Sequence, residues 1–110
     1  MAAMTDPVRH DHIDRFNAAV LSGDWSALIA TLHPDAVMTF AGVPVGPFHG
    51  RQAIADAYAT NPPGDTMRVV EVRPGTDGET VAFAWSRGGT GTLDIRRRAG
   101  QIIGLHIRFD

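Results

Sequence analysis

The first part of the chain carries apolar residues at helical spacing. Ile13, Phe16 and Val20 recur at intervals of three and four residues, which predicts an amphipathic helix. The dipeptide Asp6-Pro7 is typical of a helix start, because Asp caps exposed backbone N–H groups and Pro fits the first helical position. The pattern therefore predicts a helix that begins near residue 7.

Gly23 suits the end of this helix, and Asp24 is placed to cap a second, short one. Pro34 is expected to end the second helix. Its predicted buried stripe consists of Trp25, Leu28, Ile29 and Leu32. A third helix is predicted over residues 51–60, where Ile54 and Tyr58 lie one turn apart.

Strand patterns separate and follow these helices. Residues 36–40 predict a short strand, and the glycines and prolines of residues 41–50 indicate a loop or a broken hairpin. From Thr66 onward the hydrophobic period changes to two. The strands predicted there span residues 67–73, 80–87, 91–98 and 101–109. Helices followed by antiparallel strands favour an α+β fold with helices packed on one face of a curved sheet.

The last hairpin predicts where one carboxylate lies. A two-residue turn at 99–100 would place Asp94 opposite Leu105, with Thr92 and Arg96 on the same face. The apolar face of the preceding strand carries Phe83 and Trp85. If that face joins the same side of the sheet, the Asp94 carboxyl lies in an apolar concavity.

Composition narrows the function classes. The length of 110 residues favours a single domain over residues 1–110. The absence of cysteine excludes thiol nucleophiles, and all ten basic residues are Arg, which excludes a Schiff-base lysine. A net charge of −2 argues against a nucleic-acid partner. Without the apolar core of a signal peptide or a membrane span, we expect a soluble cytoplasmic protein with no membrane partner.

The order of elements resembles the NTF2-like superfamily, in its SnoaL-like and ketosteroid-isomerase-like branch. The matching segments are SGDW at 22–25, HPDAV at 33–37, HGRQAI at 49–54 and the closing hairpin. The resemblance runs from about Ile13 to Phe109. It implies a cone, in which a strongly bent mixed sheet wraps around three helices and an apolar pocket opens between them. It also implies a homodimer and chemistry without a cofactor.

Ketosteroid isomerases pair an Asp base with an oxyanion hole made of a Tyr and a protonated Asp. The resemblance places the oxyanion-hole Asp on Asp94 and a supporting Tyr on Tyr58. The oxyanion-hole Tyr falls on Phe16, and the base Asp falls on Phe40. Because two of these roles are vacant, steroid isomerisation by that mechanism is not expected here.

Three residues are the catalytic candidates. A buried Asp94 would act as an acid or oxyanion stabiliser, whereas pairing with Arg96 or Arg98 would make it structural. Tyr58 would be either a second hydrogen-bond donor or an aromatic at the pocket rim. His49, just before the third helix, would line the pocket mouth and replace the missing base.

The other histidines favour structural roles. His10 and His12 are interpreted as a solvated first turn, because positions two apart on a helix point away from each other. His33 suits the end of a helix, and His106 falls on the outer face of the predicted hairpin. No histidine spacing indicates a metal site.

The predicted pocket is apolar and suits a flat hydrophobic molecule. Its lining residues are expected to be Phe16, Trp25, Met38, Phe40, Phe48, Phe83, Trp85, Leu105, Ile107 and Phe109. The leading hypothesis is a cofactor-independent isomerase, cyclase or dehydratase acting on a hydrophobic carbonyl compound such as a polyketide or a steroid.

Two other functions stay open. The phenylalanines at positions 16 and 40 favour a non-catalytic ligand-binding or dimerisation domain. An epoxide hydrolase would need Asp94, Arg96 and a second pocket carboxylate, for which Asp35 and Asp56 are the solvent-facing candidates.

Overall fold

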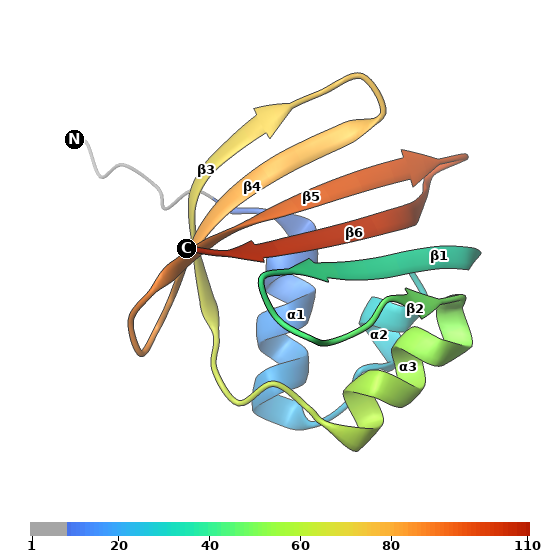
Figure 1. Ribbon diagram of the computed structural model, residues 1–110, viewed down its shortest axis with the longest axis horizontal. Helices are drawn as coiled ribbons and strands as arrows, with labels where there is room; N and C mark the ends of the chain where they lie inside the picture. Colours follow the sequence, from blue (N-terminus) through green and yellow to red (C-terminus); the bar gives the residue numbers. More distant parts are fainter. Residues whose placement is uncertain (1–8) are drawn as a thin grey trace, which may run out of the picture.

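The computed structural model describes residues 9–110 (Figure 1). The helices are α1 (Asp11–Ser22), α2 (Ser26–Ile29) and α3 (Arg51–Thr60). The strands are β1 (Leu32–Ala41), β2 (Phe48–His49), β3 (Met67–Pro74), β4 (Gly78–Trp85), β5 (Thr90–Arg98) and β6 (Gln101–Phe109). No helix within residues 9–110 has the length and apolar character needed to cross a membrane.

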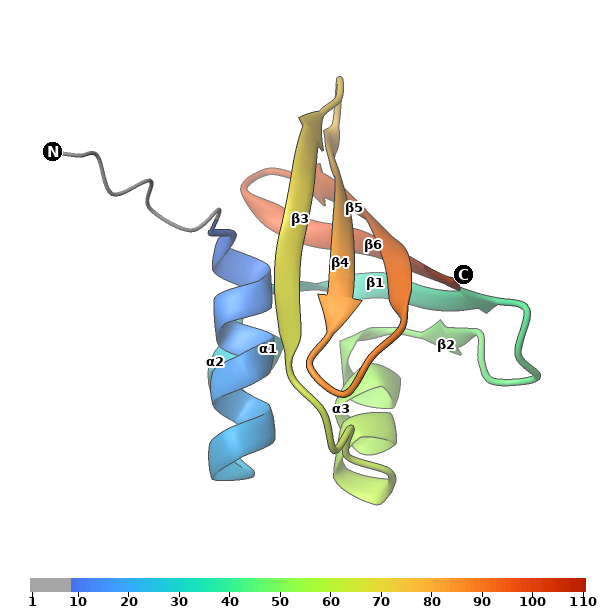
Figure 2. The same cartoon turned by 90° about the vertical axis from the view of Figure 1, so that its left-hand side faces the viewer.

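The strands form one six-stranded sheet in the order β2-β1-β6-β5-β4-β3. β1 and β6 are parallel and all other neighbours are antiparallel, so the sheet is mixed. Figure 2 shows its strong twist: β3 and β4 run almost at right angles to β6 and β1. The α1 helix contacts β3, and α3 contacts β1 and β2. The α+β class expected from the sequence is confirmed.

The buried side of α1 carries the helical pattern seen in the sequence. Ile13, Phe16 and Ala19 are buried, and Gly23 ends the helix with a φ of 81° and an N–H that donates to the Ala19 carbonyl at 2.7 Å. A left-handed φ of this kind favours glycine. The helix begins at Asp11. The predicted start at Asp6-Pro7 lies outside the described residues.

Pro34 does not end α2, and that prediction is wrong. The α2 helix already stops at Ile29, and Pro34 lies within β1. A proline is tolerated there because the β1–β6 pairing shifts between Leu32 and Val37, so no ladder hydrogen bond requires its missing N–H. The N-cap residue of α2 is Trp25 rather than the predicted Asp24, which lies one position earlier. The Asp24 carboxylate nevertheless accepts from the Ser26 N–H at 3.0 Å.

The register of the β5–β6 hairpin differs from the prediction. The two-residue turn is present, and Arg98 pairs with Gln101. The register then shifts, because Arg97 pairs with Ile102 but Arg96 pairs with Gly104. Ile103 is therefore an extra residue, a β-bulge. A one-residue bulge shifts the pairing by one position, so each residue of β5 beyond it lies opposite a different residue of β6 than predicted. The β6 residues that share a face with a given β5 residue change accordingly.

The predicted position of Asp94 in an apolar concavity is wrong for this reason. Asp94 lies opposite His106, whereas Leu93 lies opposite Ile107 and Ile95 opposite Leu105. Leu93 and Ile95 are buried in the core together with Val81 and Phe83 of β4. The sheet face toward the helices, called the inner face below, is thus apolar along most of β5.

Asn17 of α1 fixes the edge strand β3. Its side-chain amide donates to the Met67 carbonyl and its carbonyl accepts from the Met67 N–H, both at 2.8 Å. This reciprocal pair imitates a strand neighbour and satisfies both backbone groups of Met67. The helix and the far edge of the sheet are thereby held together around the core.

Gly91 lies directly under the Phe83 ring, and this contact predicts a stability effect. A Cβ at position 91 would lie 2.5 Å from the Phe83 ring and 2.6 Å from the Arg108 carbonyl oxygen. We expect Gly91→Ala to lower the free energy of unfolding by about 2 kcal/mol through overpacking. Gly64→Ala is the control, because nothing lies within 4 Å of its Cβ position. Urea denaturation measures both, and equal stabilities would contradict the packing described.

Candidate functional site

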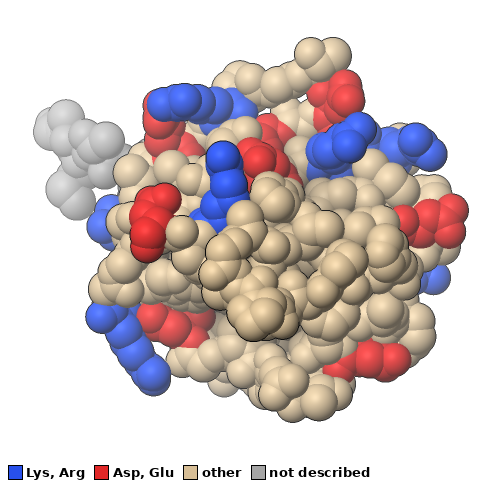
Figure 3. Space-filling model, viewed as in Figure 1, with Lys and Arg blue, Asp and Glu red and all other residues tan. Residues whose placement is uncertain are grey.

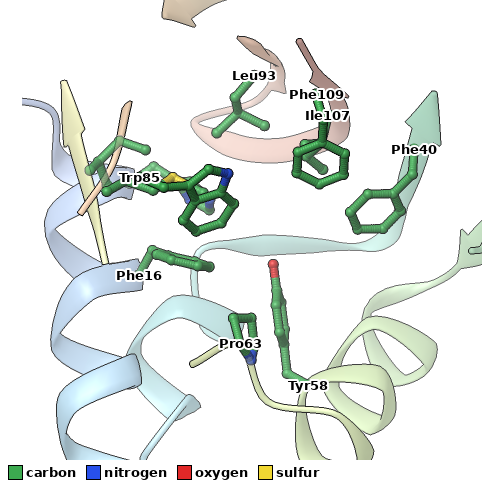
Figure 4. A pocket seen from close by; sticks show the side chains of 11 residues that line it. Phe16, Phe40, Tyr58, Pro63, Trp85, Leu93, Ile107 and Phe109 are labelled. Carbon is green, nitrogen blue, oxygen red and sulfur yellow. The ribbon is translucent and has the colours of Figure 1, made fainter. Parts of the chain in front are cut away.

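A cavity of about 200 Å³ lies between the inner face of the sheet and the helices. It is called the inner cavity, and Figure 4 shows its side chains converging on one space. They come from α1, α3, the segment after α3 and the five strands β1, β3, β4, β5 and β6. Its lining residues are His12, Ile13, Phe16, Phe40, Tyr58, Pro63, Met67, Trp85, Leu93, Ile107 and Phe109. Three of these side chains carry a polar group, namely the imidazole of His12, the hydroxyl of Tyr58 and the indole N–H of Trp85. The others are apolar.

Tyr58 brings a hydroxyl group into this apolar space. Its ring stacks on Trp25, with centroids 4.3 Å apart, and its hydroxyl points into the cavity in Figure 4. The hydroxyl donates to the sulfur of Met38 at 3.5 Å, and a thioether is a weak acceptor. Burial raises the pKa of Tyr58 well above its usual value. The group is therefore a permanent proton donor whose present partner a ligand oxygen can replace.

His12 is the second polar side chain of the inner cavity. It is 3% exposed, and its Nδ1 is buried without a hydrogen-bond partner among the described residues. Burial, and then the positive charges of His10, Arg97 and Arg15, lower its pKa to about 3. The imidazole is therefore neutral at physiological pH. A buried polar atom without a partner costs about 1–3 kcal/mol, which a bound hydrogen-bonding ligand would offset.

A charged network holds the first turn of α1 and hence His12. The Nδ1 of His10 accepts from the His12 backbone N–H at 3.2 Å, so His10 carries its proton on Nε2. That Nε2 lies 2.5 Å from Glu79, whose carboxylate accepts two further bonds from Arg97 at 3.1 and 2.9 Å. The Arg97 bonds lower the pKa of Glu79, so it stays ionised.

This network corrects the interpretation of His10 and His12 as a solvated turn. Both histidines are buried, because Glu79 at the far end of the inner face draws His10 onto the sheet. The sequence does contain one indication that His12 is buried. It precedes Phe16 by four positions, which places both on the same helix face.

Half of the predicted pocket residues line the inner cavity. These are Phe16, Phe40, Trp85, Ile107 and Phe109. Phe109 stacks between Phe40 and Trp85, with centroids 6.2 and 6.3 Å away, so these rings form a continuous aromatic wall. Ile13, Pro63, Met67 and Leu93 also line the cavity but were not predicted.

A second hollow of about 460 Å³ adjoins the first and is called the outer groove. Phe40, Tyr58 and Pro63 line both hollows, so the two hollows are neighbours. The predicted pocket residues Met38 and Phe48 lie along this groove. Three other predicted pocket residues, Trp25, Phe83 and Leu105, line neither hollow, because their side chains are packed in or against the core.

Asp94 lies on the opposite, outer face of the sheet. Its carboxylate accepts from the Thr80 hydroxyl at 2.8 Å and lies 3.8 Å from the Arg108 guanidinium. His106, its cross-strand neighbour, contacts the Thr39 hydroxyl at 2.6 Å. The sheet therefore separates Asp94 from the inner cavity, and Arg96 is not its ion-pair partner.

His49 also lies away from both hollows. It is exposed on β2, where it pairs with Val37. His33 lies within β1 rather than at a helix end, and its Nδ1 accepts from the Asp35 N–H at 3.0 Å. Asp56 is exposed but lines the outer groove. Over residues 9–110, no three His, Asp or Glu side chains gather in an arrangement that would hold a metal ion.

Comparison with known proteins gives a family and a fold. The family model described as the SnoaL-like domain matches residues 13–106. A structure named as a candidate polyketide cyclase from Sinorhizobium meliloti is 22% identical, covers 90% of this chain and 94% of its own, and has a TM-score of 0.70. No curated protein matches the sequence.

Two further solved structures share the fold. A candidate isomerase from Bacillus subtilis is 18% identical, with 91% of this chain and 84% of its own covered and a TM-score of 0.70. A Catenulispora acidiphila protein with a ketosteroid isomerase-like fold, solved with trimethylamine, is 13% identical. Its comparison covers 91% of this chain and 85% of its own, with a TM-score of 0.72.

The buried His12 predicts a pH-dependent stability. Its folded pKa of about 3 lies below the unfolded value of 6.5, so its contribution is complete above pH 6.5 and is lost as the pH falls toward 3. Between pH 6.5 and pH 5 we expect a loss of roughly 2 kcal/mol from this group.

The measurement is guanidinium denaturation at several pH values. We expect His12→Phe, which cannot titrate, to remove this part of the pH slope, whereas the exposed His49→Gln keeps it. Equal slopes in wild type and His12→Phe would show that His12 is not buried in its neutral form.

Proposed function

Because the chain belongs to the SnoaL-like domain family, we propose that it binds a hydrophobic carbonyl compound in the inner cavity and moves a proton next to the carbonyl group. The observation that carries this proposal is that His12 and Tyr58 line the same apolar cavity. The Nδ1 of His12 has no hydrogen-bond partner among the described residues, and the Tyr58 hydroxyl donates only to a thioether sulfur. An isomerase or cyclase type of reaction agrees with the names of the two candidate enzymes among the related structures.

The cavity volume sets the size of the ligand. An apolar cavity of about 150 Å³ accepts benzene, and drug-sized pockets measure roughly 300–1,000 Å³. At about 200 Å³ the inner cavity fits one ring or two small fused rings. A four-ring steroid exceeds this volume, so the part of the substrate that the inner cavity holds is smaller than the steroid-like ligand expected from the sequence.

Tyr58 takes the role of oxyanion stabiliser in this proposal. Its hydroxyl would leave Met38 and donate to the carbonyl oxygen of the substrate. Because burial raises the pKa of Tyr58, the hydroxyl keeps its proton when the oxygen becomes negative, so the hydrogen bond strengthens along the reaction. This is the differential stabilisation that lowers a barrier.

His12 takes the role of the base. In the tautomer with its proton on Nε2, Nδ1 presents a lone pair. The carbon–hydrogen bond beside the carbonyl breaks, the proton passes to the imidazole and the electron pair moves to the carbonyl oxygen. The low pKa makes His12 a weak base in the empty cavity, and the adjacent enolate raises that pKa once it forms. Returning the proton to another carbon completes an isomerisation.

A non-catalytic ligand-binding domain is the second candidate. The observation that favours it is the apolar lining at Phe16 and Phe40, where ketosteroid isomerases carry polar groups. Both functions use the same cavity and the same hydrophobic ligand class. They differ in whether the enzyme exchanges a carbon-bound proton with solvent. Asp94 and His49 have no role in either, because they lie outside the cavity.

The test is proton exchange on a one-ring β,γ-unsaturated ketone in deuterated water, with conjugation followed by ultraviolet absorbance. We expect His12→Phe to lower kcat/KM at least about 100-fold, since general bases contribute about 10²–10⁴. Tyr58→Phe is expected to lower it about tenfold or more through the lost oxyanion hydrogen bond. Asp94→Asn is the control and should retain wild-type activity.

Binding of a fluorescent naphthol separates the alternatives. Naphthol binding without proton exchange by the wild type would favour the ligand-binding domain. Loss of activity in Asp94→Asn with normal stability would overturn the placement of the reaction in the inner cavity.

A further inference from the structure

The inner cavity is not a closed compartment, because the outer groove begins where it ends. Phe40, Tyr58 and Pro63 line both hollows, and Figure 4 shows these three side chains along one border of the inner cavity. A ligand that extended from the inner cavity past these three residues would stay in contact with the protein along the outer groove. The groove is about 460 Å³ and more than twice the volume of the inner cavity.

The walls of the groove are apolar and come from two sides. Val45 lies on the connection between β1 and β2, Phe48 is the first residue of β2, and Ala53 and Ala57 lie one turn apart on α3. The small alanines leave space that larger side chains would fill, while Val45 remains 47% exposed. Figure 3 shows that the surface over β1, β2 and their connection is mostly free of charged side chains. An apolar chain therefore fits this groove.

The polar groups of the groove lie at the end of α3. They belong to Asp56, Thr60 and Asn61, and Asp56 is the one charged residue among the groove's described lining. The Asp56 carboxylate accepts from the neutral Gln52 amide at 3.0 Å and forms no ion pair with an arginine of residues 9–110. The groove therefore carries an uncompensated negative charge.

The aromatic rings beside the groove also favour a positively charged ligand group. Phe40 and Phe48 meet edge to face beside the groove, with centroids 6.4 Å apart. An aromatic face attracts a cation, and so does the Asp56 carboxylate. A carboxylate or phosphate on the ligand would meet only repulsion here, since no basic residue lines the groove.

We infer that the outer groove holds the tail of the ligand, an apolar chain of a few carbons that ends in a protonated amine. The inference rests on the proposed function, because the ring system of the same molecule occupies the inner cavity. The ligand is thus amphipathic and elongated, with a small carbonyl-bearing ring at one end and a cation near Asp56 at the other. Tyr58 lies at the junction and contacts both parts.

The test uses a naphthol head with four different tails. The probes are the naphthol without a tail and its derivatives with aminobutyl, hydroxybutyl and carboxybutyl tails, titrated by fluorescence at low ionic strength. We expect the aminobutyl probe to bind about three- to tenfold more tightly than the hydroxybutyl probe. The carboxybutyl probe should bind most weakly of the tailed probes.

Two variants test separately the charge of Asp56 and the volume of the groove. Asp56→Asn should make the aminobutyl and hydroxybutyl probes bind equally, while Asp35→Asn, an exposed carboxylate outside the groove, should change nothing. Ala57→Leu should fill the groove and abolish the advantage of any tail, with binding of the tailless naphthol unchanged.

Each outcome has one meaning. If the tailless naphthol binds and no tail improves binding, the inference is wrong and the proposed function stands. If the amine preference survives in Asp56→Asn, the charge argument is wrong. If no probe binds the wild type, the proposed function itself fails.

Discussion

The extra residue at Ile103 decides which side chains of β5 face the helices, and the site depends on that choice. With the bulge, Leu93 and Ile95 enter the core and Asp94 turns to the outer face, where Thr80 and Arg108 hold it. Without it, a carboxylate would stand where the cavity is now apolar. Successive side chains of a strand point to opposite faces of the sheet. A one-residue change of register therefore decides whether Asp94 or its apolar neighbours Leu93 and Ile95 lie on the inner face. The polar chemistry of the cavity therefore comes from the helices, through His12 and Tyr58.

The position of His12 depends in turn on contacts at the end of the sheet. Arg97 holds Glu79 with two hydrogen bonds, Glu79 binds His10, and His10 caps the backbone of α1 at His12. Arg97 and Glu79 lie on neighbouring strands of the inner face, where the apolar core ends. Their charges compensate each other and satisfy an imidazole, so a polar cluster closes the core without an unpaired charge. The start of α1, the sheet and the His12 side chain thus form one connected unit.

Local signals in the sequence were sufficient for much of the fold. The α3 helix and β6 have the predicted bounds, because alanine-rich helical spacing and a two-residue Ala99-Gly100 turn define them locally. The family resemblance is confirmed by the match over residues 13–106. The face of β5 was missed because the turn sets the register only beside itself, and nothing in the sequence marks Ile103 as extra. The alternation of Leu93 and Ile95 within β5 already favours an outward Asp94. The burial of His10 could not be seen at all, since it depends on Glu79, 69 positions away.

The inner cavity also has a consequence for the energetics of the whole chain. Unfilled apolar volume costs about 24 cal/mol per Å³, so a dry hollow of about 200 Å³ forgoes up to roughly 5 kcal/mol. Small domains have only about 5–15 kcal/mol of stability in total. Larger side chains at Leu93 or Ile107 would recover part of this loss, yet the sequence leaves the space open. A ligand bound there as proposed would therefore raise the heat resistance of the chain and lower its sensitivity to proteases.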